Sequence, residues 1–365
     1  MPNLVSKKNT EDGSDIYELL PKLPENKCTL LLSFSIKNQQ EKLLEYFNSK
    51  NIKHEILDST IKTEINSLEY FVIDIIDEMN LYNEIEMETI NLLLLENDEI
   101  LDYHTFGKVQ SLLKTYRLIK GKDIIYILNN KQLKTYFQPI IDVKRKEIFA
   151  YECLSRGIKK DGSLMGSHLL FKIASKNNLL YYLDREARQT ALTNVLANKI
   201  DKKIFINFVP NSIYNPETSL RDTLDWAEKL GIKKENLVFE VIETEKIVDI
   251  KYLNATLETY REQGVQIALD DIGSGYSSLS LLSELKPDYI KVDMDIVRDI
   301  HKNDFNQSIL KALAYLAKKH NVKILTEGVE TKEELDYCIS QGVDYVQGFF
   351  FSQPTLKPIQ NIEVM

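Results

Sequence analysis

Short apolar runs recur along the chain from Thr135 onward, and amphipathic stretches separate most of them. The runs are TYFQPII, EIFAYECL, KKIFINF, NLVFEVI, QIALDDI, YIKVD, KILTE and YVQGFFF. The intervening stretches include RDTLDWAEKLG and NATLETYREQG, which end at glycine as helices commonly do. Only the first two runs, joined by DVKRK, are close enough for a hairpin. The alternation predicts a TIM-type (β/α)8 barrel over residues 131–365, with an antiparallel first strand.

The first third of the chain has a different pattern. Residues 1–25 are expected to be a polar leader. After it, CTLLLSFSI predicts a strand, KNQQEKLLEYFNSKN an amphipathic helix and IKHEILDS a second strand. Residues 71–97 are an apolar run followed by acidic sequence of helical character, and residues 106–132 are mostly helical in pattern. We therefore expect a smaller α/β domain with a helical linker over residues 26–130. No motif there carries chemistry, so we interpret it as sensory or regulatory, with an unknown input.

Composition and charge exclude several classes of protein. The chain is 43% hydrophobic and 28% charged, and no apolar run approaches the roughly 18–20 residues of a membrane helix, so we expect no membrane insertion. Its N-terminus lacks the apolar core of a secretory signal, and three separated cysteines (Cys28, Cys153, Cys338) form no paired framework, which favours the cytoplasm. Residues 1–130 hold 22 acidic against 14 basic side chains, a net −8 that makes a nucleic acid polymer an improbable partner.

Polar residues recur near the carboxyl ends of the apolar runs. In a barrel these ends open onto one face, so residues far apart in sequence become neighbours. Any one of them alone is equally well a cap or a satisfied surface group, but their recurrence favours a functional site. The residues are Glu152, Asn207, Glu240, Asp270, Asp271, Lys291, Asp293, Glu327 and Gln347.

Such a cluster needs cations. Carboxylates crowded together repel one another and raise their pKa values unless positive charge compensates, and Lys291 is a single charge among five acids. Carboxylate oxygens and the Asn207 amide suit Mg²⁺ or Mn²⁺ as hard cations. The tandem pair Asp270 and Asp271 is well suited to bridge two metal ions, an arrangement used in phosphodiester hydrolysis.

Eight motifs in order resemble those of the EAL-domain phosphodiesterases, which hydrolyse cyclic di-GMP. They are QPIIDV, ECLSR, IFINF, FEVIE, LDDIGSGYSSL, IKVD, TEGVET and QGFFFSQP, and together they span about residues 135–354. No such resemblance covers residues 1–130. The resemblance implies cyclic di-GMP as substrate, two Mg²⁺ or Mn²⁺ ions per active site, linear pGpG as product, and a homodimer.

The same resemblance implies a role for each matching residue. Metal ligands are expected at Glu152, Asn207, Glu240, Asp270, Asp271 and Glu327. Catalytic residues are expected at Lys291, which positions the attacking water, and at Glu327 and Glu152. Substrate contacts are expected at Gln138, Arg156 and Gln347, and Gln347 with Glu327 is also expected to hold water. Glu243 and Asp293 are expected to stabilise the loop after the tandem aspartates. Arg156 has an alternative as a salt-bridge partner of a nearby carboxylate.

Three departures from the family pattern affect these expectations. Cys153 replaces the signature alanine, with little expected effect on catalysis, while Ile272 and Ser274 change the aspartate loop. The stretch KKDGSLMGSHLLFKIASKNN lacks the usual proline before its helix, which bears on substrate affinity. The favoured hypothesis is a metal-dependent hydrolase regulated by the N-terminal domain. The alternative is a catalytically weak or inactive cyclic di-GMP receptor or interaction module.

Overall fold

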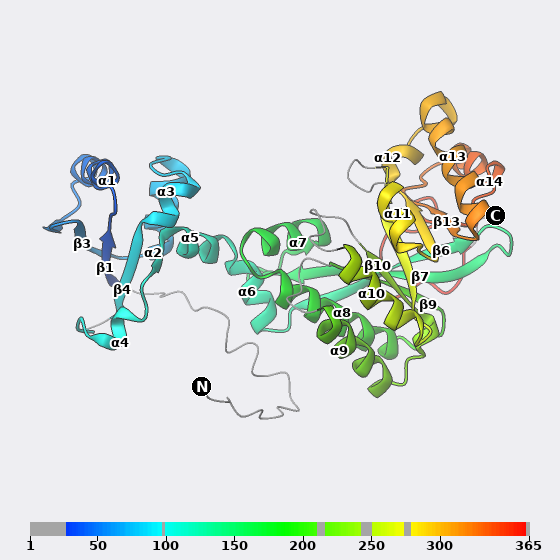
Figure 1. Cartoon of the computed structure of the whole chain (residues 1–365), viewed down its shortest axis with the longest axis horizontal. Coiled ribbons are helices and arrows are strands. Elements are labelled where there is room, and N and C mark those ends of the chain that lie inside the picture. The colour runs from blue at the N-terminus through cyan, green and yellow to red at the C-terminus, as the bar shows by residue number, and fades with distance from the viewer. Residues whose placement is uncertain (1–26, 97–98, 210–215, 242–249, 274–278, 363–365) are drawn as a thin grey trace. The chain divides into compact units, whose positions relative to one another are not determined.

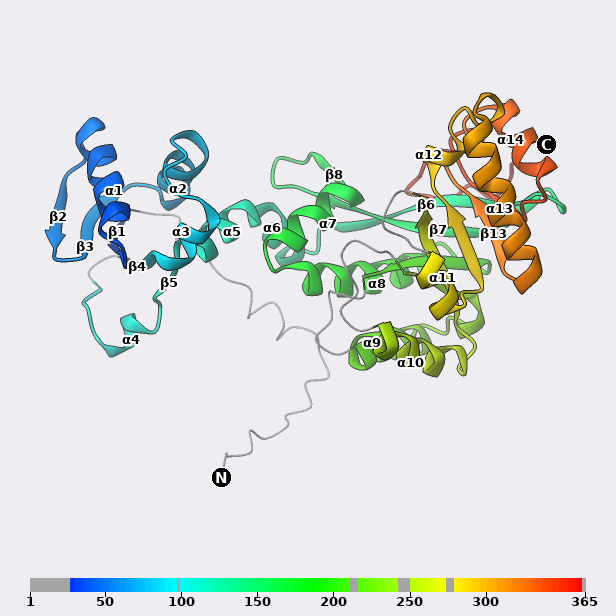
Figure 2. The ribbon, with the colours of Figure 1, turned by 45° about the horizontal axis from the view of Figure 1, so that its top comes forward.

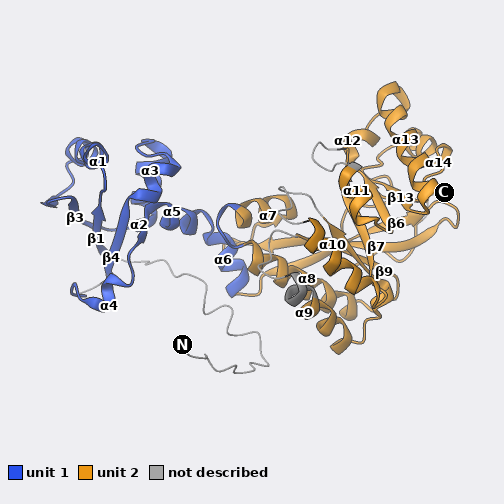
Figure 3. Ribbon diagram, viewed as in Figure 1, with its two compact units in different colours: residues 1–129, 176–179 blue, residues 130–175, 180–365 orange. Residues whose placement is uncertain are grey.

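The structure is a computed structural model, and it describes residues 27–96, 99–209, 216–241, 250–273 and 279–362 (Figure 1). The expected leader at residues 1–25 lies outside the described residues. The chain divides into two compact units (Figure 3). Unit 1 comprises residues 1–129 and 176–179, and unit 2 comprises residues 130–175 and 180–365. No helix among the described residues combines the length and the apolar character needed to cross a membrane.

Unit 1 is built on a five-stranded sheet in the order β2-β3-β1-β4-β5, in which every neighbouring pair is antiparallel (Figure 2). The strands are β1 (Cys28–Ser33), β2 (His54–Leu57), β3 (Thr60–Ile65), β4 (Asn91–Glu96) and β5 (Gln110–Ser111). The helices are α1 (Lys37–Ser49), α2 (Leu68–Ile73), a π-helical turn (Asp74–Glu78), α3 (Glu84–Thr89), α4 (Tyr103–Phe106), α5 (Leu112–Lys120) and α6 (Lys122–Asn129). Leu30 and Leu32 of β1 pack with Leu43 and Phe47 of α1, so the sheet buries one face under its helices.

The predicted smaller α/β region is therefore present, but the sequence pattern identified only part of its sheet. The first strand, the helix after it and the second strand are confirmed as β1, α1 and β2. The prediction that residues 71–97 turn helical after their apolar run was partly wrong, because Asn91–Glu96 forms β4. Its four consecutive leucines have no strand periodicity, and pairing with β1 decides their conformation.

Unit 2 contains a closed barrel of eight strands in the order β6-β14-β13-β12-β11-β10-β9-β7, closed by the pairing of β6 with β7. Strand β6 is antiparallel to both of its neighbours and the others are parallel, which confirms the predicted (β/α)8 barrel with an antiparallel first strand. The strands are β6 (Leu133–Asp142), β7 (Glu147–Ile158), β9 (Lys203–Phe208), β10 (Leu237–Val241), β11 (Gln266–Ile272), β12 (Tyr289–Val292), β13 (Lys323–Thr326) and β14 (Tyr345–Val346), with β8 (Leu164–Gly166) added beside β7.

Helices surround the barrel and bury its outer face (Figure 1). They are α7 (Ser167–Lys176), α8 (Leu180–Ala197), α9 (Pro216–Lys229), α10 (Ile250–Arg261), α11 (Leu279–Leu285), α12 (Met294–Val297), α13 (Asp304–His320) and α14 (Lys332–Ser340), with 3-10 turns at Lys234–Asn236 and Ile300–Lys302. Inside the barrel, each of the eight strands contributes one side chain to a separate apolar layer. The layer consists of Ile140, Ala150, Phe205, Val238, Ala268, Tyr289, Leu325 and Tyr345.

The last barrel strand is shorter than the sequence predicted. The apolar run YVQGFFF pairs only through Tyr345 and Val346, and the chain then turns at Gly348. A β-carbon at Gly348 would lie 2.0 Å from the carbonyl oxygen of Val329, a contact that only glycine permits. The Val329 amide donates to the Gln347 carbonyl at 3.0 Å, so this close approach fixes the residue beside Gly348.

We predict that Gly348→Ala lowers the free energy of unfolding of the barrel by about 1–3 kcal/mol, because the new methyl group clashes with backbone atoms that have little freedom to move. The matched control is Gly166→Ala, where an added β-carbon meets no atom within 4 Å. Urea unfolding of the two variants and the wild type measures the difference. Equal stability of both variants would contradict the close packing at Gly348.

Candidate active site

A polar layer lies directly above the apolar layer inside the barrel. Successive side chains of a strand point to opposite faces, so the residue two positions beyond each apolar layer residue also points inward. On the seven parallel strands these positions follow the layer, and on antiparallel β6 the position precedes it. The resulting residues are Gln138, Glu152, Asn207, Glu240, Asp270, Lys291, Glu327 and Gln347. All eight were predicted as site residues, and the layer brings them together.

Lys291 is the centre of this layer. Its side chain is 1% exposed, and its Nζ lies 2.6 Å from Glu240 Oε1, 2.9 Å from Asp270 Oδ1 and 2.5 Å from Glu327 Oε1. Glu152 Oε1 lies further away, at 3.6 Å. Burial disfavours the charge on Lys291, but the four carboxylates outweigh burial and raise the pKa of Lys291 well above its ordinary value. The ammonium group therefore keeps its proton at neutral pH.

One ammonium ion does not balance this set of acids. Burial and repulsion from Glu152 and Asp270 raise the pKa of Glu240 well above its usual range, despite the opposing effect of Lys291. Burial, with repulsion from Asp270 and Glu152, does the same for the pKa of Glu327. Glu240 and Glu327 therefore ionise less readily than they would in water, and a bound cation would favour their ionised forms.

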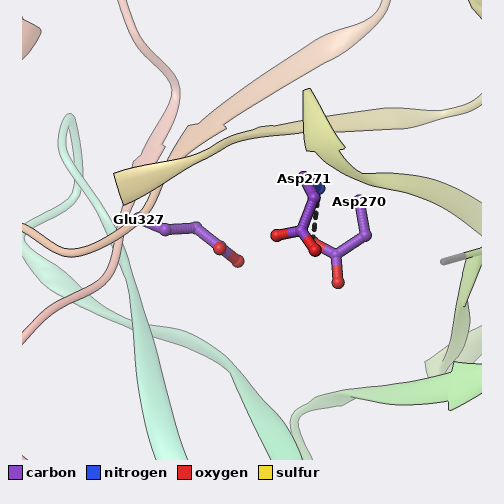
Figure 4. Close-up of side chains that lie close together, drawn as sticks. All are labelled: Asp270, Asp271 and Glu327. Atoms are coloured by element: carbon purple, nitrogen blue, oxygen red, sulfur yellow. Dashed lines mark hydrogen bonds between the residues drawn. The ribbon is translucent and has the colours of Figure 1, made fainter. Parts of the chain in front are cut away.

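Asp270, Asp271 and Glu327 form a group whose carboxylate oxygens lie within 4.8 Å of one another. Figure 4 shows the Glu327 carboxylate pointing toward those of the two aspartates. Adjacent strand residues normally point to opposite faces, but Asp271 has a left-handed backbone with φ of +54°, and the pairing of β11 with β12 is irregular between Leu269 and Ile272. The irregular backbone turns both aspartates toward one space, and the Asp271 amide donates to Asp270 Oδ1 at 3.0 Å.

The donor set fits a hard divalent cation. Asn207 pairs in register with Glu240 on the neighbouring strand, and its buried Oδ1 has no hydrogen-bond partner among the described residues. A buried amide oxygen without a donor is costly unless a ligand completes it. The described residues of this set offer carboxylate and amide oxygens and no sulfur or imidazole ligand, which matches the preference of hard divalent cations rather than that of zinc.

Gln138 and Gln347 connect Glu152 to the first and last strands of the barrel. Gln347 Nε2 donates to Glu152 Oε2 at 2.5 Å and to Gln138 Oε1 at 2.9 Å. Gln138 Nε2 donates in turn to the carbonyl oxygen of Ser352 at 3.2 Å. Gln138 was predicted only as a substrate contact, and in this structure its amide is already engaged within the protein.

Arg156 lies on the same face of β7 as Glu152, four residues further along. Its Nη1 donates to the Ser155 carbonyl at 2.9 Å and to Ser167 Oγ at 2.8 Å, and its guanidinium lies over the Tyr136 ring, 5.6 Å from the centroid. Among the described residues no carboxylate lies within ion-pair distance of Arg156, so the predicted alternative of a salt bridge finds no support there.

Sequence reasoning missed Ser167 and Tyr136. The alternation along the strand could have identified Tyr136, which precedes Gln138 by two residues on the same strand. Ser167 follows Gly166, and only the pairing of Gly166 with Arg156 across the hairpin brings Ser167 close to Arg156. Ser167 also begins α7, where the family proline was noted as absent.

The profile of the EAL domain family matches residues 123–354. The chain belongs to the EAL domain family. The chain is 32% identical over 234 residues to the probable cyclic di-GMP phosphodiesterase PdeG of Escherichia coli (strain K12), a match that covers 62% of this chain and 45% of that protein. The chain thus spans under half the length of this curated relative.

Two solved EAL structures resemble the barrel. A standalone EAL protein of Vibrio cholerae O395, in its c-di-GMP bound form, is 34% identical with a TM-score of 0.57, covering 63% of this chain and 95% of that one. The Bacillus subtilis YkuI protein, in complex with c-di-GMP and calcium, is 27% identical with a TM-score of 0.58, covering 66% of this chain and 60% of that one.

Asp293 and Glu243 of the EAL barrel were predicted to stabilise the loop after the tandem aspartates. Asp293 Oδ1 accepts the Asp295 amide at 2.7 Å, which caps α12, and its side chain also hydrogen-bonds Asp271. Glu243 lies outside the described residues. Cys153 is buried in the core between the strands and the surrounding helices, on the opposite face of β7 from Glu152.

We predict that Mn²⁺ binding to the EAL barrel weakens as the pH falls below about 7. Burial and repulsion from Asp270 raise the pKa of Asp271 to about 7 in the metal-free protein, so below that pH the carboxyl group holds a proton that a cation must displace. Calorimetric titration with Mn²⁺ at several pH values from about 6 to about 8 measures the trend. Asp271→Asn is the control, with weaker binding and a flatter pH profile. An affinity that does not change across this range would contradict the prediction.

Proposed function

We propose that this protein hydrolyses cyclic di-GMP to linear pGpG in a reaction that requires divalent cations. The observation that carries the proposal is the polar layer itself, in which Asn207 and the buried carboxylates lie around Lys291 at the mouth of the barrel. Membership in the EAL family and the name of its relative PdeG support the choice of substrate.

Two groups of side chains are proposed to hold two Mg²⁺ or Mn²⁺ ions. Glu152, Asn207, Glu240 and Asp270 supply oxygens for one ion, and Asp270 with Asp271 and Glu327 supplies them for the other. Bound divalent ions would supply Lewis acidity, lowering the pKa of water and stabilising negative charge on the phosphate.

The protein's own residues are proposed to orient the attack. The water oxygen bonds to phosphorus and the bond from phosphorus to O3′ breaks. Of the two water protons, one ends on O3′ and the other is released from the new phosphate group to solvent, which gives the linear product. Lys291 keeps its proton, and its Nζ is proposed to position and polarise the water as a fixed positive charge. Gln347 commits both amide hydrogens to Gln138 and Glu152, so its buried Oε1 is the atom left to accept from the water.

Arg156 is proposed to bind a phosphate of the substrate. Its contacts to Ser155 and Ser167 use Nη1, and Tyr136 supports the plane of the guanidinium group. The remaining N–H groups are suited to the geometry of a phosphate.

We predict that purified protein with Mg²⁺ or Mn²⁺ produces linear pGpG, and that Glu152→Gln lowers kcat by roughly 100-fold or more, because the change removes one anionic ligand at constant size. Glu147→Gln is the matched control, since Glu147 is exposed at the opposite end of the same strand, and it leaves kcat unchanged. Product is measured by chromatography. Bound nucleotide without linear product in the wild type would refute hydrolysis and favour the receptor alternative.

We further propose that unit 1 regulates the barrel, that the protein is a homodimer, and that it acts in the cytoplasm. Unit 1 has a core of its own, and at its π-helical turn the buried Asp74 accepts a 2.5 Å hydrogen bond from Tyr46. π-helical turns occur often at functional sites, which supports a signalling role.

We predict that Phe47→Leu, which loosens the core of unit 1, changes kcat of the barrel while the barrel's unfolding midpoint stays constant. Sedimentation of the full chain with and without cyclic di-GMP measures the dimer in parallel. An unchanged kcat in a variant with a demonstrably loosened unit 1 would count against regulation by that unit.

A further inference from the structure

We propose that Gln138 is a positioning residue, which holds the Gln347 amide in the orientation that directs Glu152 toward the metal site. The inference rests on the proposed function and departs from the expectation that Gln138 mainly contacts substrate.

The orientation of the amides follows from the groups at the two ends of a chain of hydrogen bonds that runs from Glu152 to the carbonyl oxygen of Ser352. A carboxylate and a backbone carbonyl only accept hydrogen bonds, and an amide side chain has one accepting and one donating end. Glu152 is at one end of the chain and the Ser352 carbonyl is at the other, with Gln347 and Gln138 between them. With Gln347 Nε2 turned to Glu152, a reversed Gln138 would set its Nε2 against Gln347 Nε2 and its Oε1 against the Ser352 carbonyl. Only the observed orientation satisfies every contact.

The Ser352 carbonyl is a firm anchor for this chain of hydrogen bonds. The Ser352 amide donates to the Gly348 carbonyl at 3.2 Å, which closes the turn after β14. Three residues later, Thr355 forms a two-way backbone bridge with Phe137, the neighbour of Gln138, at 2.8 and 3.0 Å. The segment that carries the Ser352 carbonyl is thus attached to β6 one residue away from Gln138.

Burial strengthens this chain of hydrogen bonds. Gln138, Glu152 and Gln347 are 8%, 7% and 3% exposed, so water competes weakly for their hydrogen bonds. If Gln138 lost its amide, Gln347 would keep only its hydrogen bond to Glu152 and its amide would be less restrained. Gln347 is the only side-chain amide that donates to Glu152 among the described residues, so the direction of the carboxylate would be less well fixed. Partners of this kind fix the direction of metal ligands and commonly contribute 10- to 100-fold to affinity or activity, a rough guide for Gln138.

The test is a double-mutant cycle with Gln138→Met, Gln347→Met and both together, using Mn²⁺ affinity by calorimetry and kcat and KM for cyclic di-GMP. We expect Gln138→Met to lower Mn²⁺ affinity and kcat by about 10-fold or more, with KM changed less than about threefold. In the Gln347→Met background the same change should have an effect of less than about twofold, because the link it acts through is already lost.

A control variant separates this role from a general loss of stability. Gln266 lies at the opposite end of the barrel, where it accepts a 3.1 Å hydrogen bond from Tyr289. Gln266→Met should leave Mn²⁺ affinity and kcat unchanged, even if its urea midpoint falls. Should Gln138→Met fold poorly, Gln138→Leu provides the same comparison with a smaller side chain.

Two results would overturn the inference. A rise in KM with kcat and Mn²⁺ affinity unchanged would make Gln138 a substrate contact alone, and equal effects of Gln138→Met in both backgrounds would remove the link through Gln347. If the wild type binds Mn²⁺ but does not hydrolyse the nucleotide, the Mn²⁺ cycle still decides the inference, so its failure differs from failure of the proposed function.

Discussion

The buried ammonium group of Lys291 is the contact on which the mouth of the barrel depends. Four carboxylates from four other strands lie within 3.6 Å of its Nζ, in a layer closed from below by apolar side chains. Such an interior strengthens every charge interaction, and it also makes an uncompensated carboxylate costly by several kcal/mol. Lys291 offsets part of the cost of burying these acids, and the raised pKa values of Glu240 and Glu327 indicate that a further cation would stabilise their ionised forms.

The placement of two adjacent carboxylates at one site explains why the backbone at Asp271 is irregular. A regular strand would direct only one of two adjacent aspartates into the mouth. The left-handed conformation of Asp271 places both there, at a cost on the order of 1 kcal/mol for a residue other than glycine. Asp293, which caps α12 and hydrogen-bonds Asp271, ties this strained position to the next strand. Positive φ values also occur in turns elsewhere in the described chain, but at Asp271 the conformation adds a carboxylate to the group of Asp270 and Glu327, which fits a site rather than a structural turn.

The sequence predicted the barrel, and the convergence of the polar residues at its mouth, because both follow from one periodicity. The inward alternation that sets Ala150, Phe205 and Val238 in the apolar layer also sets Glu152, Asn207 and Glu240 above it. The local sequence pattern did not predict the conformation of segments whose conformation depends on tertiary contacts. Strand β4 is a run of leucines whose pairing with β1 gives its conformation, and β14 ends early because Gly348 approaches the Val329 backbone. The supports of Arg156 escaped notice because Ser167 reaches it only across the hairpin.

The antiparallel first strand gives the barrel a seam that also serves the site. Because β6 runs against its neighbours, its inward polar residue precedes the apolar layer residue Ile140 instead of following it, and Gln138 arrives beside Glu152 in register. On its other side β6 pairs with β14, the last strand, which brings Gln347 within reach of both. The seam thus holds the side-chain amides of Gln138 and Gln347, which are proposed to orient the carboxylate of Glu152. No loop joins the first and last strands of the barrel to each other, so these hydrogen bonds couple closure of the barrel directly to the geometry of the Glu152 carboxylate.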